Sequence, residues 1–443
     1  MGQDLVSRQT HLARFRRLLT SPAMIPLGMI LLIASALVFG RKPQVDAAGR
    51  PIVVYAHPPC PPDLMVIYNQ IFARFRQTHP GIDLKVLHIT GQYQDKVKVM
   101  FAGNVAPDVI FMYPYDLPAW VAVHALVPLN SRLGPPSQSG YFAPMLEAFT
   151  VHGQIYGLPK DASAPVLFYN TELFRKYHVP VPNDHWTWQD LLAAARQLTV
   201  DTDGDGRINQ WGLNAPEWQL LVWSFGGRIL DASHTRCRLD RPEALAGLRF
   251  WADLLHKYHV VPPPEVNNDI NAMEMFCLGR VAMNLQMYPA VSVFRKQADF
   301  PWDIAPVPRG PAGRVTQIEG SALAITSQCR TRRAAFTFIR WMTTTGEQML
   351  ASVEPPCYRD PANIQAFLDN QDPPAAKRVA LEAMAYAHPP IQSPVYNQIT
   401  DALSPLLNQA QRGEIPVAQA ARQATRSVDQ IISRYDTDHT HGE

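Results

Sequence analysis

The segment IYGLPKDASAPVLFYNTELF, residues 155–174, decides our interpretation of the fold. It begins with the turn residues Gly157 and Pro159 and continues through small and polar side chains to a second proline. An apolar run at 166–168 and an apparent helix start after Asn170 follow. A strand inside one compact domain needs no such entry. The pattern therefore indicates an exposed connecting segment of small residues that leads into a buried strand.

The residues upstream of this segment alternate between strand and helix patterns. Residues 52–55 are typical of a short buried strand, and 63–78 place apolar residues at helical spacing until Pro80 and Gly81 end the helix. A strand at 82–86, a helix at 96–102 and an apolar run at 109–112 complete the series. This order predicts a parallel sheet with right-handed crossovers. Ligands gather beyond the carboxyl ends of such strands, here the loops 57–62, 88–93 and 113–120, and His57 is expected to be a loop residue.

Three further elements follow from the pattern downstream. Thr187 and Asp190 are spaced to cap a helix whose apolar face begins at Leu191. Residues 321–326 indicate a strand and 332–343 a helix. The chain ends in a long amphipathic helix, whose apolar face carries Val417, Ala421, Ala424, Val428, Ile431 and Tyr435.

Length and composition limit the classes of protein to which this chain can belong. A chain of 443 residues exceeds the usual size of one core, and 47% hydrophobic with 18% charged residues is ordinary for a soluble, well-packed protein. Five scattered cysteines include no C-x-x-C pair, so a disulfide framework or a cysteine zinc site has no support. Basic residues interleaved with aromatics do not cluster outside the N-terminus, and nucleic acid is not an expected partner.

The N-terminus has the pattern of an export signal. Four arginines, at positions 8, 14, 16 and 17, precede an apolar run at 24–39. The alternative is an uncleaved transmembrane anchor, for which the run is short and interrupted by Pro26. Either interpretation predicts a periplasmic or extracytoplasmic protein.

Several motifs, in their order and spacing, resemble those of one family. They are FARFRQTHPGIDLKV, PDVIF at 107–111, ALVPLN at 125–130, the YGLP…LFYN segment, TWQDLLAAARQLT, DTDGDGRINQWGL and FCLGRVAMNLQ. Together they resemble the bacterial extracellular solute-binding proteins of the sugar-binding class, which include the maltose-binding proteins. The resemblance covers nearly everything from residue 52 to residue 435.

The resemblance implies a periplasmic-binding-protein-like α/β fold with two lobes, a multi-strand hinge and a ligand cleft between them. Lobe 1 would comprise residues 51–162 and 310–354, and lobe 2 residues 163–309 and 355–436. Residues 1–50 would be the export signal or anchor with its linker, and 437–443 a flexible tail. Small residues at 160–164 suit a hinge that absorbs backbone rotation, although an ordinary loop remains the alternative.

A sugar site combines aromatic platforms with polar groups at their rim, and the sequence offers both at the expected positions. The candidate ligand-binding residues are Tyr113, Tyr115, Asp116, Asp161, Trp218, Trp223, Tyr288, Glu319 and Tyr396. Lys160 and Ser163 lie beside Asp161 on the proposed hinge. Tyr288 and Tyr396 stand where relatives carry aromatic residues beside the cleft. The two tryptophans could equally pack into the second lobe, and Asp116 could cap a turn.

The sequence DTDGDGRIN is the clearest candidate for a metal site. Its ligands would be Asp201, Asp203, Asp205, the carbonyl of Arg207 and Asn209. Gly212 occupies the twelfth position, so the bidentate glutamate of a complete calcium loop is missing. A structural Ca²⁺ site and a solvated acidic turn are both open, and no other cofactor is expected.

No catalytic motif emerges, because G-x-S-x-G, H-E-x-x-H and the phosphate-binding loop are all missing. We therefore expect a monomeric binding protein, not an enzyme. It would capture a carbohydrate by lobe closure and deliver it to an ABC-type permease. The alternatives are a membrane-tethered sensor of the same fold and an extracellular carbohydrate-active enzyme.

Overall fold

The computed structural model describes residues 45–134, 139–267, 271–346 and 354–440. The chain forms two compact units. Unit 1 comprises the residues up to Ile110 together with Ile325–Thr337, and unit 2 comprises Phe111–Ala324 and Phe338–Glu443. The lobe boundaries expected from the family resemblance stay a prediction.

Unit 1 contains the strand–helix order that the sequence predicts. Strand β1 (Ile52–His57) pairs in parallel with β2 (Asp83–His88) and with the first residues of β3 (Val109–Met112). Helices α3 (Pro62–Thr78) and α4 (Tyr93–Ala102) form the two connections. The buried face of α3 consists of Tyr68, Ile71, Phe72 and Phe75, as its helical spacing indicates.

The expectation that His57 belongs to a loop is wrong. His57 is the last residue of β1 and is buried, with its ring edge-on to Tyr68 at 4.6 Å between centroids. The strand extends because Ala56 and His57 continue the parallel register with Leu87 and His88.

Most of the segment 155–174 forms two strands. The expectation of an exposed connecting segment, drawn from its turn residues, is therefore wrong. Strand β6 (Gly157–Ser163) pairs antiparallel with β14 (Glu319–Ile325), and β7 (Pro165–Asn170) begins after a single residue, Ala164. Because β7 belongs to a different sheet, the chain changes sheets at this one small residue. Backbone pairing with β14, 160 residues away, overrides the local turn signals.

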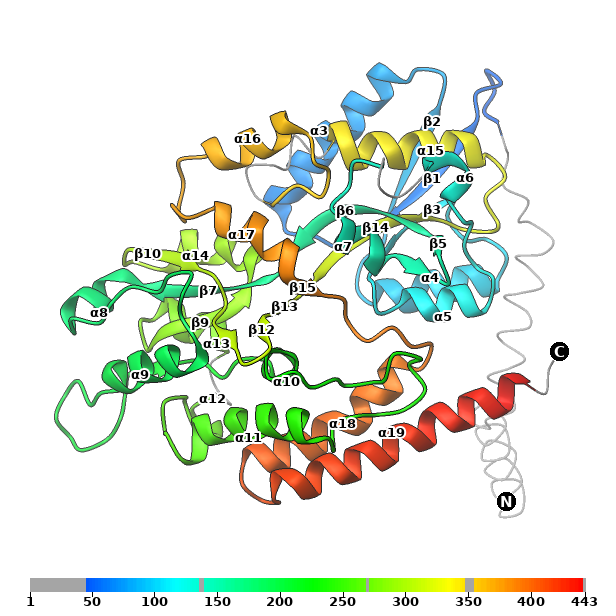
Figure 1. Cartoon of the computed structure of the whole chain (residues 1–443). Helices are drawn as coiled ribbons and strands as arrows, with labels where there is room; N and C mark the ends of the chain where they lie inside the picture. The colour runs from blue at the N-terminus through cyan, green and yellow to red at the C-terminus, as the bar shows by residue number, and fades with distance from the viewer. Residues whose placement is uncertain (1–44, 135–138, 268–270, 347–353, 441–443) are drawn as a thin grey trace, which may run out of the picture. The chain divides into compact units, whose positions relative to one another are not determined.

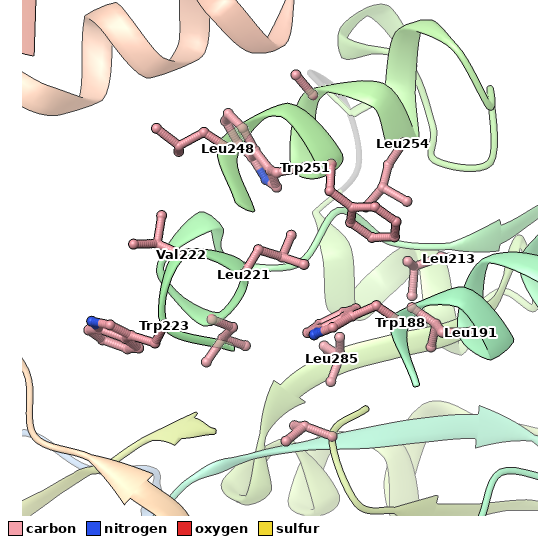
Figure 2. Packing of buried hydrophobic residues seen from close by; sticks show 14 of the residues in the cluster. Trp188, Leu191, Leu213, Leu221, Val222, Trp223, Leu248, Trp251, Leu254 and Leu285 are labelled. Atoms are coloured by element: carbon pink, nitrogen blue, oxygen red, sulfur yellow. The ribbon is translucent and has the colours of Figure 1, made fainter. Parts of the chain in front are cut away.

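The second sheet of unit 2 has the strand order β10-β7-β9-β8. Strands β10 (Trp302–Ala305) and β9 (Val281–Met287) flank β7 in antiparallel pairing, and β8 (Trp211–Leu213) runs parallel to β9. Figure 2 shows how Leu213 and Leu285 of this sheet pack with residues from three helices: α9 (Trp188–Leu198), α10 (Trp218–Ser224) and α11 (Pro242–His256). The buried indole of Trp188 donates a hydrogen bond to Ser224 Oγ at 2.8 Å, so this large side chain carries no unmet polar group.

The C-terminal helices complete the same core. Helices α18 (Tyr396–Gln411) and α19 (Val417–Thr440) pack against each other and against α11 (Figure 1). Ala421, Ala424 and Val428 of α19 are fully buried, which confirms the apolar face predicted for the terminal helix.

The remaining elements are short. They are α5 (Leu117–Ala122), α6 (Asn130–Leu133), α7 (Ala143–Ala148), β4 (Thr150–Val151), β5 (Gln154–Ile155), α8 (Thr171–Lys176), α12 (Pro264–Asn267), α13 (Ala272–Cys277), η2 (Tyr288–Ala290), α14 (Val291–Gln297), β11 (Arg309–Gly310), β12 (Gly313–Arg314), β13 (Thr316–Gln317), α15 (Arg332–Trp341), η3 (Met342–Gly346), α16 (Pro361–Asp369), α17 (Arg378–Ala383), η5 (Met384–Tyr386) and β15 (Ala387–His388).

Within the described ranges, no helix has both the length and the apolar character needed to cross a membrane. The apolar run at 24–39 lies outside the described residues.

The capping pair predicted at Thr187 is present. Thr187 Oγ1 accepts from the Asp190 backbone N–H at 3.3 Å, and Asp190 Oδ2 accepts from the Thr187 N–H at 2.8 Å. These bonds satisfy two of the amide groups that a helix start leaves unpaired.

We predict that Thr187→Ala lowers the free energy of unfolding by about 1 kcal/mol, since the side-chain cap of α9 is lost. Urea denaturation followed by circular dichroism measures this change, and Thr187→Ser is the matched control that keeps the cap. Equal stability of the alanine variant and the wild type would show that the cap contributes nothing.

Candidate functional site

Three tyrosine rings, two of them near each other in the sequence and one almost 300 positions away, form one stack. Tyr113 and Tyr115 have centroids 5.1 Å apart and planes inclined by 12°, and Tyr115 and Tyr396 have centroids 5.1 Å apart with planes inclined by 19°. The first two follow β3 directly, and Tyr396 is the first residue of α18. We call these three residues the tyrosine stack. Flat rings with hydroxyl groups at their edges suit the weakly apolar faces and the hydroxyl rim of a sugar.

The charges of several carboxyl groups act on the tyrosine stack. The pKa of Tyr396 is raised by burial and then by the negative charges of Glu319, Asp116 and Glu217. Burial and the charge of Asp161 raise the pKa of Tyr113. The structure thus brings together six of the predicted residues: Tyr113, Tyr115, Asp116, Asp161, Glu319 and Tyr396.

Asp161 is held by strand β14. Its carboxylate accepts from the Ser321 backbone N–H at 2.6 Å and from Ser321 Oγ at 2.5 Å. The ammonium of Lys160 lies 2.5 Å from the same carboxylate and 3.8 Å from Glu354. These contacts make Asp161 a residue that fixes β6 to β14, with its negative charge already compensated by Lys160.

Glu319 stands in a different electrostatic setting. It lies directly opposite Ser163 in the antiparallel register and accepts a hydrogen bond from Gln317 Nε2 at 3.0 Å. Its pKa is raised by burial and then by the charge of Glu217. Glu217 is exposed as a residue, but desolvation by the surrounding protein still raises the pKa of its carboxyl group. The two carboxyl groups therefore interact in partly dry surroundings.

The two predicted tryptophans line neighbouring cavities. Trp218 lies beside Tyr396 and Gln317 around a cavity of about 50 Å³. Trp223 lines this cavity and a second one of about 470 Å³, where its ring stacks on His388 at 4.6 Å between centroids. Trp223 is also a member of the hydrophobic core in Figure 2. It therefore both packs in the core and lines the cavities. The larger volume falls within the range of small-ligand pockets.

Tyr288 lies apart from these residues. It is 1% exposed and packs in a separate core cluster, with its ring 5.6 Å from that of Phe367. Its assignment as a ligand residue stays a prediction that the geometry of the tyrosine stack does not support. The sequence reasoning missed Glu217 and Gln317, although each stands close in sequence to a residue that it did select, Trp218 and Glu319.

The acidic loop gathers its three aspartates. Oxygens of Asp201, Asp203 and Asp205 lie within 4.8 Å of one another. The Asp201 carboxylate accepts from the N–H groups of Gly204 and Gly206, each at 2.7 Å, and the Gly206 bond is the main cause of its lowered pKa. Asn209 Oδ1 accepts from Thr202. Calcium at this loop stays a prediction.

The comparisons with known proteins agree with this fold. The family model of the bacterial extracellular solute-binding proteins matches residues 61–349. An uncharacterized lipoprotein in the oleD 5′ region of Streptomyces antibioticus is 25% identical over 353 residues, covering 73% of this chain and 76% of the relative. A maltotriose-binding protein of Pyrococcus abyssi is 23% identical over 319 residues, covering 69% of this chain and 65% of the relative.

Solved structures show the same architecture. The ABC substrate-binding protein Lmo0181 of Listeria monocytogenes, in complex with cycloalternan, aligns with a TM-score of 0.75 and 22% identity over 86% of this chain and 99% of that one. A cyclic alpha-maltosyl-1,6-maltose binding protein of Arthrobacter globiformis aligns with a TM-score of 0.74 and 18% identity, over 87% and 100%. The fold is that of the periplasmic binding proteins, with two α/β lobes. The chain belongs to the bacterial extracellular solute-binding protein family, whose members act outside the cytoplasm.

We predict that Glu319→Gln raises the melting temperature of the ligand-free protein at neutral pH. The folded-state pKa of Glu319 lies above its ordinary value of 4.5. The folded protein is therefore stabilised by the neutral carboxyl group below about pH 4.5, and this contribution to the free energy of unfolding is lost as the pH rises through the raised pKa. Glutamine stays neutral throughout. Melting curves between pH 4 and pH 8 should show a difference that grows with pH, and a difference independent of pH would contradict the assignment.

We also predict that Ca²⁺ raises the melting temperature relative to a sample in EDTA, because the ion would relieve repulsion among the three aspartates. Asp203→Asn should reduce the shift, and Mg²⁺ is the control ion. An unchanged melting curve would identify the loop as a solvated turn.

Proposed function

We propose that this protein captures a carbohydrate outside the cytoplasm and delivers it to an ABC-type permease. The observation that carries the proposal is the tyrosine stack, on whose Tyr396 the charges of Glu319 and Asp116 act, in a chain of the solute-binding family. The relatives named for maltotriose and for cyclic alpha-maltosyl-1,6-maltose support a sugar or oligosaccharide as the solute.

The mechanism is a shift in the population of conformations. A solute that contacts both lobes binds the closed form better than the open form and so favours closure. The closed complex is then the form that the permease recognises. A carrier of this kind returns its solute unchanged, and we propose a monomer without enzymatic activity.

We also propose that residues 1–50 direct export, either as a cleaved signal or as a retained anchor. N-terminal sequencing of the mature protein separates the two. An intact N-terminus would support the anchor and, with it, the tethered-sensor alternative.

The test is calorimetric titration with a panel of sugars and oligosaccharides. We expect Tyr396→Ala to weaken binding about fivefold, or about 1 kcal/mol, since the ring face that packs on the sugar is lost. Tyr396→Phe keeps the ring and should retain most of the affinity.

Two outcomes would count against the proposal. Unchanged affinity of Tyr396→Ala would remove the tyrosine stack from the binding site. Hydrolysis of an oligosaccharide, detected by chromatography of the recovered ligand, would point to the enzyme alternative.

A further inference from the structure

Two carboxyl groups whose charges act on Tyr396, those of Glu319 and Glu217, form no ion pair within the described residues. Three carboxyl groups, those of Glu319, Asp116 and Glu217, are the largest electrostatic influences on the Tyr396 hydroxyl. Among the described residues, no lysine, arginine or histidine forms an ion pair with Glu217 or Glu319. Lys160, whose charge acts on Tyr113, is paired with Asp161 and Glu354.

A buried hydroxyl group beside Glu319 also lacks a hydrogen-bond partner within the described residues. Ser163 is 7% exposed, and its Oγ has no hydrogen-bond partner within the described residues. Because directly paired residues of an antiparallel sheet project to one side, Ser163 and Glu319 share a face. Asp161, two residues before Ser163, projects to that side as well. Unpaired buried polar groups are costly, so a ligand donor at this point would stabilise the site.

From this arrangement we infer that the solute is a carbohydrate bearing a protonated amine, which Glu319, Glu217 and Ser163 bind beside the ring of Tyr396. The inference rests on the proposed function and adds the charge class of its solute.

The chemistry of the site favours an ammonium over other cations. An ammonium group donates three hydrogen bonds, which suits two carboxylates and one hydroxyl oxygen. It also interacts favourably with the face of an aromatic ring, whereas hard divalent ions require six or more oxygen ligands. A neutral sugar would leave the repulsion between Glu217 and Glu319 in place, and an anionic sugar would add to it.

The experiment compares sugars that differ at one substituent. Wild-type protein is titrated calorimetrically at pH 6 with glucosamine, N-acetylglucosamine and glucose, and with the β-1,4-linked disaccharides of the same three units. The galactose series and neutral maltooligosaccharides extend the panel. We expect an amine-bearing sugar to bind at least tenfold tighter than its hydroxyl and N-acetyl counterparts. Near pH 9 the preference should disappear, because the amine of glucosamine lies beside electron-withdrawing carbon–oxygen bonds and, like an α-amino group, loses its proton near pH 8.

Variants then test the residues. Glu319→Gln and Glu217→Gln should reduce the preference for the amine to threefold or less while neutral sugars still bind. Glu243→Gln, a change at an exposed glutamate in the first turn of α11, is the matched control and should leave the preference intact. Melting curves of each variant confirm that it is folded.

The outcomes separate the two proposals. If neutral sugars bind as tightly as their amine counterparts, or if Glu319→Gln keeps the full preference, the inference is overturned and the proposed function stands. If no carbohydrate of any charge binds the wild type, the proposed function fails and the inference fails with it.

Discussion

The pairing of β6 with β14 is the constraint on which the candidate site depends. It joins residues 160 positions apart and is fixed by the two hydrogen bonds from Ser321 to the Asp161 carboxylate. The close approach requires a glycine at position 320, because a Cβ there would lie 2.4 Å from the Asp161 carbonyl oxygen and the backbone φ is +145°. With this register in place, Ser163 faces Glu319, and the chain can pass into the second sheet at Ala164.

Several groups of the candidate site reduce the stability of the ligand-free fold. Burial raises the pKa of both Glu319 and Glu217, and the charge of Glu217 raises that of Glu319 further. The hydroxyl of Ser163 is buried without a hydrogen-bond partner in the described part of the chain. Such arrangements are unfavourable in a ligand-free protein and are typical of binding sites, where local rules of folding give way to function. A solute that supplies donors and positive charge would relieve both features at once. The same groups would then lower the stability of the ligand-free protein and provide its affinity for the solute.

The sequence predicted the local elements well and the long-range ones poorly. The strand–helix order of unit 1, the Thr187 cap and the apolar face of α19 follow from periodicity and capping chemistry, which act over a few residues. Strand β6 was missed because Pro159 and the small residues after it favour turns, whereas its pairing partner lies far along the chain. Their position after the third predicted strand placed Tyr113 and Tyr115 among the candidates, and family resemblance added Tyr396. No sequence pattern shows that Tyr115 stacks on Tyr396. The same limit applies to Tyr288, whose burial against Phe367 depends on a distant helix.

The most direct test of this account is a crystal structure of the protein with its carbohydrate bound. The account predicts a sugar ring against the ring of Tyr396, with one of its polar substituents hydrogen-bonded to Glu319. A sugar bound beside Tyr288, with Tyr396 and Glu319 free of contact, would contradict it.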